Sequence, residues 1–274
     1  MIQIFGGSGF AGSYFIDQFS SEELIINSRD DYSVSNKVDE IVYFISTVSN
    51  YNVKDNPFVD IDTNLSTLMR VLSQCKDLNL TFNFISSWFV YGDTEMPAKE
   101  ESICNPSGFY SITKRCAEQL LISYCKTFNI KYRIFRLANI VGYGDKKASP
   151  QKNALQYMIN ELKSGRDIYL YEAGNIYRDY IHVKDAVVAI KLVMQANKFN
   201  EIINISNGNP VLLKEIIDIA YSHIEKPGKV NSIKTPEFHK NVQVQSMWID
   251  NSKLVRYGYK QQYSIEDMIK DMIR

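Results

Sequence analysis

Short apolar segments alternate with longer segments of helical periodicity along most of the chain. Strands that are linked by helices and buried on both faces form parallel sheets. The alternation therefore predicts an α/β fold with a doubly wound, Rossmann-like parallel sheet. The expected strands are Ile2–Phe5, Leu24–Ile26, Ile41–Ile45, Leu80–Ile85, Tyr132–Leu137, Ile168–Leu170 and Ile202–Ile205. The expected helices lie around Gly9–Phe19, Val59–Cys75, Tyr110–Phe128, Asn153–Lys163, Val183–Gln195, Leu213–His223 and Ser264–Ile273.

A glycine-rich turn links the first expected strand to the first expected helix. Its sequence, Gly6-Gly7-Ser8-Gly9-Phe10-Ala11-Gly12, has the spacing G-x-x-G-x-x-G. Glycines permit a tight turn and let the backbone approach a pyrophosphate, which then faces the free N–H groups of the helix N-terminus. In this context the pattern predicts dinucleotide binding, and the alternative is a tight turn without a ligand. The expected cofactor-binding residues in the turn are Gly6, Ser8, Gly9, Phe10, Ala11 and Gly12.

The end of the second expected strand bears on which dinucleotide is bound. In NAD-binding folds an acidic residue here accepts hydrogen bonds from the adenosine ribose. In this chain the neutral Asn27 and Ser28 are followed by Arg29, which suits the 2′-phosphate of NADP. The alternative is that Asp30 or Asp31 binds the ribose and the cofactor is NAD(H). We expect NADP(H), with Asn27, Ser28 and Arg29 at its adenosine end.

The length of the chain allows one large domain or two small ones. Its C-terminal third is less regular, and Pro227 and Pro236 interrupt it. We expect residues 1–165 to form a dinucleotide-binding Rossmann domain. Residues 166–274 are expected to form mainly a smaller substrate-binding lobe, with some segments returning to the sheet.

Charge, cysteine and histidine content argue against several classes of function. The 31 basic residues balance 31 acidic ones, so the chain lacks the basic excess typical of nucleic-acid and membrane-surface binders. Its four cysteines form no C-x-x-C pattern and it has three histidines, so we expect reduced thiols and no metal site. A strand-like segment follows Met1 directly, and no apolar run approaches about 18 residues. We therefore expect a cytoplasmic protein without a membrane segment.

A tyrosine and a lysine are placed to share one helix face. Tyr110 and Lys114 are four residues apart at the start of a long expected helix. A neighbouring cation favours the phenolate, so such a tyrosine can exchange a proton. Two other pairs have the same spacing but begin no long helix of this kind, Tyr143/Lys147 and Tyr180/Lys184.

Two serines end the expected strand Leu80–Ile85. Ligands bind at the carboxyl ends of parallel strands, where Ser86 and Ser87 lie. Ser87 is expected to donate a hydrogen bond to a substrate carbonyl while Tyr110 delivers the proton. The alternative is that both hydroxyls only satisfy the end of the strand.

Taken in order, these motifs resemble the extended short-chain dehydrogenase/reductase family of NAD(P)-dependent nucleotide-sugar epimerases, dehydratases and ketoreductases. The resemblance covers nearly the whole chain. Besides the glycine turn and the Tyr110/Lys114 pair, it rests on Thr63-Asn64-Leu65, Ser86-Ser87 with Val90-Tyr91-Gly92, Arg136-Leu137-Ala138-Asn139-Ile140-Val141-Gly142, Arg178-Asp179-Tyr180-Ile181-His182-Val183, Ile249-Asp250-Asn251-Ser252-Lys253 and Tyr257-Gly258-Tyr259.

The resemblance implies roles for further residues. It places Asn64 beside the cofactor, and it adds Tyr110 and Lys114 to the cofactor-binding residues as well as to the catalytic ones. It also implies that Asn139 faces the substrate and that Arg178 approaches the phosphates of a sugar nucleotide. The expected catalytic residues are Ser87, Tyr110 and Lys114, and the expected substrate-binding residues are Ser86, Asn139 and Arg178.

Departures from the family pattern narrow the chemistry. Trp88-Phe89 stands where the 4,6-dehydratases carry Asp-Glu, and no cysteine follows Ser87 as in the 3,5-epimerase/reductases. The segment Asn27–Ile41 is short, so a strand of the family fold is expected to be missing, as in compact members that reduce 4-keto sugars. Reduction of a keto sugar and 4-epimerisation through a transient ketone remain, because both need only Ser, Tyr, Lys and a nicotinamide.

The leading hypothesis is NADP(H)-dependent reduction of a nucleotide-activated 4-keto-6-deoxyhexose to the 4-hydroxy sugar, in deoxysugar or polysaccharide biosynthesis. The alternatives are an NAD-dependent nucleotide-sugar 4-epimerase and a non-catalytic protein that senses dinucleotides. The family resemblance also implies a homodimer through helices within Thr67–Cys75 and Tyr110–Cys125. The alternative is a monomer in which these helices only cover the sheet.

Overall fold

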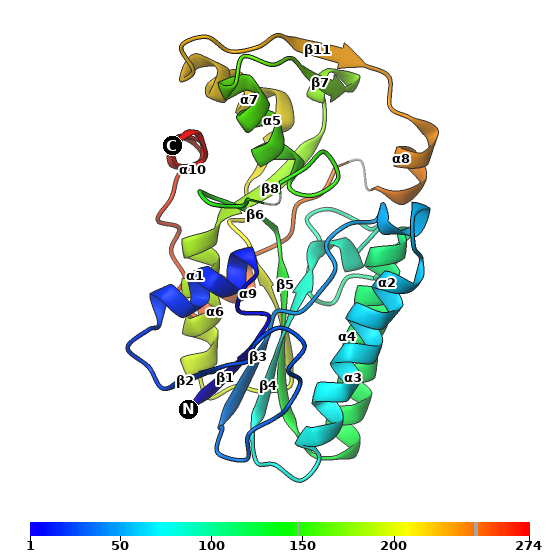
Figure 1. The fold of residues 1–274 in the computed structure, drawn as a ribbon, viewed down its shortest axis with the longest axis vertical. Coiled ribbons are helices and arrows are strands. Elements are labelled where there is room, and N and C mark those ends of the chain that lie inside the picture. Colours follow the sequence, from blue (N-terminus) through cyan, green and yellow to red (C-terminus); the bar gives the residue numbers. More distant parts are fainter. Residues whose placement is uncertain (147, 244–245) are drawn as a thin grey trace.

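The fold is built on a six-stranded parallel sheet, which confirms the predicted doubly wound α/β architecture. The computed structural model describes residues 1–146, 148–243 and 246–274. Across the sheet the strand order is β2-β1-β3-β4-β5-β9 (Figure 1). These strands are β1 (Ile2–Phe5), β2 (Leu24–Ile26), β3 (Glu40–Tyr43), β4 (Thr81–Ser87), β5 (Lys131–Leu137) and β9 (Glu201–Ile205).

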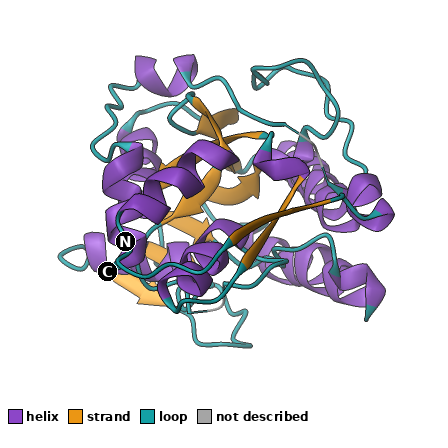
Figure 2. Ribbon diagram, turned by 90° about the horizontal axis from the view of Figure 1, so that it is seen from above, coloured by secondary structure: helices purple, strands orange, loops and turns teal. Residues whose placement is uncertain are grey.

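Helices cover both faces of this sheet and bury its apolar side chains. On one face lie α1 (Phe10–Gln18) and α6 (Val183–Gln195), and on the other lie α3 (Thr67–Leu72) and α4 (Phe109–Thr127) (Figure 1). The view from above in Figure 2 shows the helices flanking the strands. Burial on both faces explains why the strands read as continuous apolar runs. It leaves the strand ends as the accessible part of the sheet.

The predicted absence of a strand after β2 agrees with the structure, because residues 27–39 contain neither strand nor helix. Strand β2 is therefore an edge of the sheet. Gln3 on β1 fastens the segment: its Nε2 donates to Asn27 Oδ1 at 2.7 Å and to the Ser33 carbonyl at 2.8 Å. Its Oε1 accepts from the Ser35 amide at 3.0 Å.

The prediction of one regular helix over Val59–Cys75 was wrong, because the helical segment is irregular. The chain instead forms α2 (Phe58–Ile61), a π-helical turn (Asp62–Ser66), α3 and a 3-10 turn (Ser73–Cys75). The buried Asn64 lies in the π-helical turn. Its side chain is hydrogen-bonded to Ser46, Thr47 and Thr113. Side-chain contacts of this kind widen a helix locally, and π-turns are frequent at functional sites.

A second group of elements lies above the sheet in Figure 1 and has its own apolar core. One small sheet is β10-β8-β6 and the other is β11-β7. The predicted strand Ile168–Leu170 is thus β7, outside the central sheet. The elements of this lobe are β6 (Asn139–Val141), β7 (Ile168–Tyr171), β8 (Tyr177–His182), β10 (Pro210–Leu212), β11 (Val230–Ile233), α5 (Ala154–Lys163), α7 (Leu213–Ser222) and α10 (Ile265–Ile273).

Some segments cross the predicted boundary at residue 165. Helix α5 precedes it, yet Leu155 and Ile159 pack in the core of the upper lobe. Conversely, α6 and β9 follow it and belong to the central sheet layer. The remaining helices are α8 (Glu237–Val242) and α9 (Ser252–Arg256). None of the helices in the described ranges is long and apolar enough to cross a membrane.

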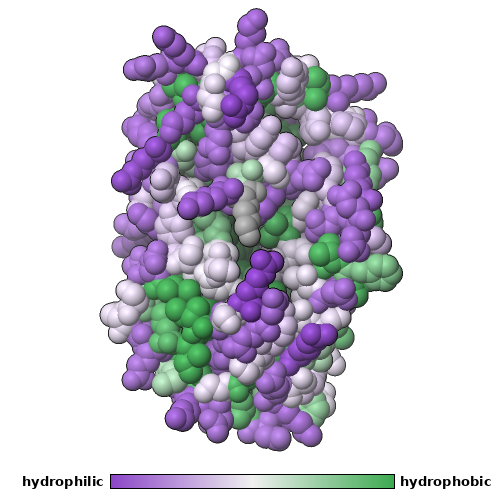
Figure 3. All heavy atoms as spheres, in the orientation of Figure 1, coloured by the Kyte–Doolittle hydropathy of each residue, from purple (hydrophilic) through white to green (hydrophobic). Residues whose placement is uncertain are grey.

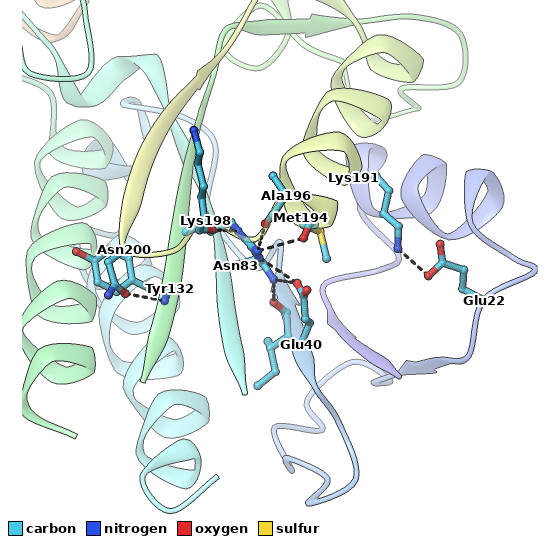
Figure 4. A network of polar contacts seen from close by, with 11 residues as sticks. Glu22, Glu40, Asn83, Tyr132, Lys191, Met194, Ala196, Lys198 and Asn200 are labelled. Carbon is cyan, nitrogen blue, oxygen red and sulfur yellow. Dashed lines mark hydrogen bonds and ion pairs between the residues drawn. The ribbon is translucent and has the colours of Figure 1, made fainter. Parts of the chain in front are cut away.

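A buried arginine ties the sheet to the end of α6. The Arg133 guanidinium on β5 donates to Glu40, Asn83 and the carbonyls of Met194, Ala196 and Lys198, at 2.9–3.3 Å. Figure 4 shows these acceptors converging from β3, β4 and the C-terminal end of α6. A cation at a helix C-terminus also complements the helix dipole. The contact stabilises the amino ends of these strands, away from the cavity described next.

Candidate active site

A large cavity lies at the carboxyl ends of the central strands, between the sheet and the upper lobe. Its volume is about 1040 Å³, enough for ligands of several rings. Figure 3 shows the surface hollowed midway along the molecule. The structure brings most of the predicted site residues to its wall, namely Gly6, Ser8, Gly9, Phe10, Ala11, Gly12, Ser86, Ser87, Tyr110, Lys114, Asn139 and Arg178.

The glycine turn has the geometry of a pyrophosphate cradle. Gly6 has a φ of +79°, and a Cβ there would lie 2.8 Å from the Ile45 amide nitrogen. At Gly12 a Cβ would lie 2.6 Å from the Gly6 carbonyl oxygen, so only glycine lets α1 approach β1 this closely. No side chain caps α1, whose N-terminal residues line the cavity. Its unpaired N–H groups and positive dipole end therefore fit an anionic group.

The predicted adenosine-end residues lie beyond β2 and outside the cavity wall. The Asn27 amide is engaged by Gln3 and by the Asp31 and Ser33 carbonyls, whereas Ser28 and Arg29 are exposed. The Asp31 carboxylate accepts hydrogen bonds from Ser33, which lower its pKa. The strand end therefore presents an exposed arginine, and the Asp31 carboxylate two residues later is already hydrogen-bonded to Ser33.

The phenol of Tyr110 is buried at the N-terminus of α4, with the Ser87 and Ser46 hydroxyls in hydrogen-bonding positions. Burial raises the pKa of Tyr110 to about 12, although the hydrogen bonds from Ser87 and Ser46 act in the opposite direction. The edge of the Tyr110 ring meets Phe89 at a centroid distance of 5.8 Å. A protonated phenol held beside a serine hydroxyl can donate its proton to a ligand oxygen in the cavity.

Lys114 follows one turn later on α4 and is also buried. Its Nζ donates to the Ile85 carbonyl at 2.7 Å and lies 4.1 Å from the Phe84 ring centroid. Burial lowers the pKa of Lys114 to about 7, and the nearby Glu118 carboxylate partly offsets this shift. The Lys114 amine can therefore exchange between its charged and neutral forms near neutral pH.

The predicted substrate-binding residues Asn139 and Arg178 meet at Trp88. The Trp88 indole nitrogen donates to Asn139 Oδ1 at 3.2 Å, and Asn139 Nδ2 donates to the Asp179 carbonyl at 2.9 Å. The Arg178 guanidinium lies 5.7 Å from the Trp88 ring centroid, and burial lowers its pKa. Trp88 stacks on Phe89 at 3.9 Å. Two aromatic rings therefore form the wall next to Ser87.

Ser86 lies on the cavity wall, but its hydroxyl is bonded to a residue of the protein interior. Its hydroxyl donates to Glu118 Oε1 at 2.7 Å, and Glu118 also pairs with Arg136. We did not expect Glu118 at the site from the sequence. Its spacing of four residues from Lys114 on one helix could have revealed it.

Predicted cofactor residue Asn64 lies behind the cavity wall rather than on it. It is buried and donates to Thr47 Oγ1 at 2.8 Å and Thr113 Oγ1 at 3.0 Å. Thr47 in turn donates to Asp60. Asn64 thus joins the loop after β3 to α4, close to Tyr110.

The wall of the cavity next to α8 includes a contact that the sequence did not predict. The Tyr51 hydroxyl, after β3, is hydrogen-bonded to His239 Nδ1 on α8. The Lys54 ammonium lies 4.1 Å from the Phe238 ring centroid. Tyr51 and His239 are 188 residues apart in the sequence, so only the tertiary structure brings them together.

Of the two other pairs with tyrosine–lysine spacing, only Tyr180/Lys184 lies wholly within the described residues. Lys147 lies outside the described residues. Tyr180 is buried on β8, whereas Lys184 is exposed at the start of α6. Nearby His182 pairs with Asp271 at 2.9 Å and stacks on Tyr263, which fastens α10 to the lobe.

A family model described as "NAD dependent epimerase/dehydratase family" matches residues 25–206, more than half of the chain. The chain belongs to this family. A putative UDP-glucose 4-epimerase of Methanocaldococcus jannaschii is 23% identical and covers 100% of this chain and 97% of its own length. A dTDP-D-glucose 4,6-dehydratase of Dictyostelium discoideum is 25% identical over 80% of this chain and 62% of its own length.

Solved structures agree on the fold. The UDP-glucose 4-epimerase of Thermotoga maritima, with UDP-glucose, superposes with a TM-score of 0.85 at 20% identity. It covers 99% of this chain and 97% of its own. RMD of Pseudomonas aeruginosa, complexed with NADPH, has a TM-score of 0.83 at 18% identity with the same coverage. At these identities the likeness establishes the Rossmann-like fold and leaves the reaction to be argued from the site.

Proposed function

We propose that this protein is an NADP(H)-dependent reductase of a nucleotide-activated 4-keto-6-deoxyhexose. The observation that carries this proposal is that Ser87, Tyr110 and Lys114 line the same cavity as the glycine turn and the uncapped N-terminus of α1. These three groups suffice for moving a proton at a sugar oxygen while a nicotinamide exchanges hydride at the carbon.

Each residue has a defined task in the proposed reaction. NADPH, held at the glycine turn and by Lys114, would supply the hydride for C4 of the sugar. Tyr110 gives its proton to O4, so that the C=O double bond becomes a C–OH group. Ser87 donates a hydrogen bond to the same oxygen, which stabilises the charge that develops there. Lys114 holds the nicotinamide ribose and favours the phenolate that remains on Tyr110. Arg178 and Asn139 orient the sugar nucleotide.

The aromatic pair after Ser87 supports redox chemistry without loss of water. Trp88 and Phe89 contribute no carboxyl group to this wall, and the Trp88 N–H is already engaged by Asn139. Removal of water from C5 and C6 would need a general acid and a base at this place. Ketone reduction needs neither, so the wall favours reduction over dehydration.

The end of β2 supports NADP(H) as the cofactor. Arg29 is exposed there, and a guanidinium pairs well with a 2′-phosphate. The glycine turn would receive the pyrophosphate. NADP(H) exchanges readily in net reduction, whereas an epimerase reuses one bound NAD.

A second candidate function is NAD-dependent 4-epimerisation of a nucleotide sugar. The similarity to a putative UDP-glucose 4-epimerase over the whole chain favours it. The same three residues would serve. Tyr110 would take the O4 proton while bound NAD took up the C4 hydride, and Tyr110 would give the proton back to O4 when the hydride returned to the opposite face of C4. Asp30 or Asp31 would then bind the adenosine ribose.

Cofactor titration followed by turnover assays separates the two candidates. Protein stripped of nucleotide is titrated with NADPH and NADH, and is then supplied with nucleotide-linked 4-keto-6-deoxyhexoses and with UDP-glucose. We expect at least tenfold tighter binding of NADPH and stoichiometric NADPH oxidation with the keto sugar. Tight, slowly exchanging NAD with interconversion of UDP-glucose and UDP-galactose would replace the reductase by the epimerase.

We further propose that the protein is a homodimer. Ile112 and Leu120 on α4 are 41% and 42% exposed, and Cys116 lies between them at helical spacing. Such an apolar stripe on a helix that otherwise covers the sheet fits a contact with a second copy.

A further inference from the structure

A fully buried carboxylate lies next to the proposed reaction centre. Glu118 is on α4, one helical turn beyond Lys114, and has no exposed surface. It accepts hydrogen bonds from Ser86 Oγ at 2.7 Å, from Arg115 Nη1 at 2.8 Å, and from Arg136 Nε at 3.0 Å and Nη2 at 2.8 Å. A buried carboxylate needs such partners, and four donors hold it in one orientation.

These contacts join the elements that carry the proposed catalytic groups. Ser86 directly precedes Ser87 at the end of β4, and Arg136 is its register partner on β5. Helix α4 carries Tyr110 at its N-terminus, about two turns before Glu118. Glu118 therefore binds a pair of facing strand residues and connects them to the helix of the catalytic tyrosine.

The link continues behind the strands. The Arg136 guanidinium lies 4.6 Å from the Tyr91 ring centroid, and the Tyr91 hydroxyl donates to Asn204 Oδ1 at 2.6 Å on β9. Arg136 is thus held from two sides, by Glu118 and by Tyr91. The Ser87 hydroxyl accepts a bond of 3.3 Å from the Phe89 amide, and its backbone continues directly from that of Ser86, so a shift of Ser86 would also move Ser87.

We propose that Glu118 is a positioning residue, which acts through the Ser86 hydroxyl to place Ser87 against the Tyr110 phenol. The inference rests on the proposed function and assigns Ser86 to this link, with its hydroxyl given to Glu118 rather than to the substrate. Hydrogen bonds that fix a catalytic group to within about half an ångström matter for rate more than for binding.

A double-mutant cycle tests the link. The variants are Ser86→Ala, Glu118→Gln and the double variant, assayed with whichever nucleotide sugar the wild type converts. Each single variant should lower kcat about tenfold with KM and cofactor Kd within about twofold, as expected for loss of an interaction needed in the transition state. The double variant should be no slower than the slower single variant, because both changes break one link.

Ser86→Ala keeps the test decisive if Glu118→Gln does not fold, since it leaves the Glu118–Arg136 pair intact. An unchanged kcat in Ser86→Ala overturns the proposal. So does a raised KM with unchanged kcat, which would make Ser86 a substrate ligand. Independent, multiplying effects in the double variant would also overturn it.

Hydrogen exchange separates failure of this inference from failure of the proposed function. Peptides covering residues 81–92 should exchange faster in both single variants than in the wild type. The double variant should exchange no faster than the faster of the two single variants. This readout needs no substrate. Unchanged exchange in Ser86→Ala contradicts the link. Glu161→Gln is the matched control, because it removes a carboxylate paired with Arg166 on the surface and should change neither exchange at 81–92 nor kcat.

Discussion

At the scale of single residues, burial decides the chemistry of the proposed centre. Tyr110 and Lys114 are both removed from water, and desolvation disfavours the charged form of each. The phenol is therefore protonated at neutral pH, with a pKa of about 12, and the ammonium has a pKa of about 7. A protonated tyrosine next to a serine hydroxyl suits proton donation to a ketone oxygen.

Replacement of Tyr110 by phenylalanine should abolish turnover and leave cofactor binding intact. The ring and its contact with Phe89 remain, whereas the proton donor is lost, and general acids contribute about 10²- to 10⁴-fold. Steady-state kinetics and an NADPH titration measure the two effects. Activity within tenfold of the wild type would remove Tyr110 from its proposed role.

The pH profile should report the ionisation of Lys114. Its ammonium has a pKa of about 7 in the folded protein, so the cation is present below this pH and is lost above it. The proposed role needs the cation, and kcat/KM for the cofactor reports the free enzyme. We expect kcat/KM to fall as pH rises through about 7, and the slow Lys114→Met variant to lack this limb. A wild-type profile that stays flat to pH 9 would contradict the assignment.

At the scale of elements, the site depends on how closely α1 approaches β1. The carbonyl of Gly6 accepts from the Gly9 amide at 3.0 Å, and Gly12 packs against the same carbonyl. This closeness points the free end of α1 at the cavity. The packing of one helix on one strand thus creates the proposed phosphate site.

Gly12→Ala should destabilise this element and weaken cofactor binding. The added Cβ would lie 2.6 Å from the Gly6 oxygen, and overpacking of this kind costs about 1–3 kcal/mol. Gly9→Ala is the matched control on the same turn, because its Cβ would meet that oxygen at 3.3 Å. Thermal unfolding and NADPH titration should show the larger loss for Gly12→Ala, and equal losses would refute the packing argument.

At the scale of the whole molecule, two lobes enclose the cavity and α8 reaches back to the sheet-bearing half. The Val242 carbonyl accepts from Asn50 Nδ2 at 2.9 Å, and His239 contacts Tyr51. The apolar stripe of Ile112 and Leu120 lies on the exposed face of α4, and neither residue lines the cavity. Cavity and stripe therefore occupy separate parts of the molecule.

The proposed dimer should dissociate when a charge is placed in this stripe. Leu120→Glu puts a carboxylate on the outward face of α4, where a partner would have to bury it at a cost. Sedimentation velocity over a concentration series should give a dimer for the wild type and a monomer for the variant. Val255→Glu, at a 51% exposed position on α9, serves as control and should stay dimeric. A monomeric wild type would end the proposal.

Much of the central sheet could be predicted because its signals are local. The glycine spacing after Ile2–Phe5 and the apolar runs of the strands can each be recognised from a few consecutive residues. Elements of the upper lobe were missed, among them β6 and β10, because each is held in place by pairing with the distant strand β8. The π-turn around Asn64 was missed because contacts to Ser46 and Thr113 from distant segments create it.

The sequence by itself determined the α/β class, the glycine turn and the candidate proton donor, since each depends on the order and spacing of a few residues. Only the tertiary structure decided that Asn27 is engaged by Gln3, that Ser86 serves Glu118, and that burial moves the pKa values of Tyr110 and Lys114. Hydrogen-bond partners and desolvation depend on which distant segments meet, and spacing along the chain does not encode that.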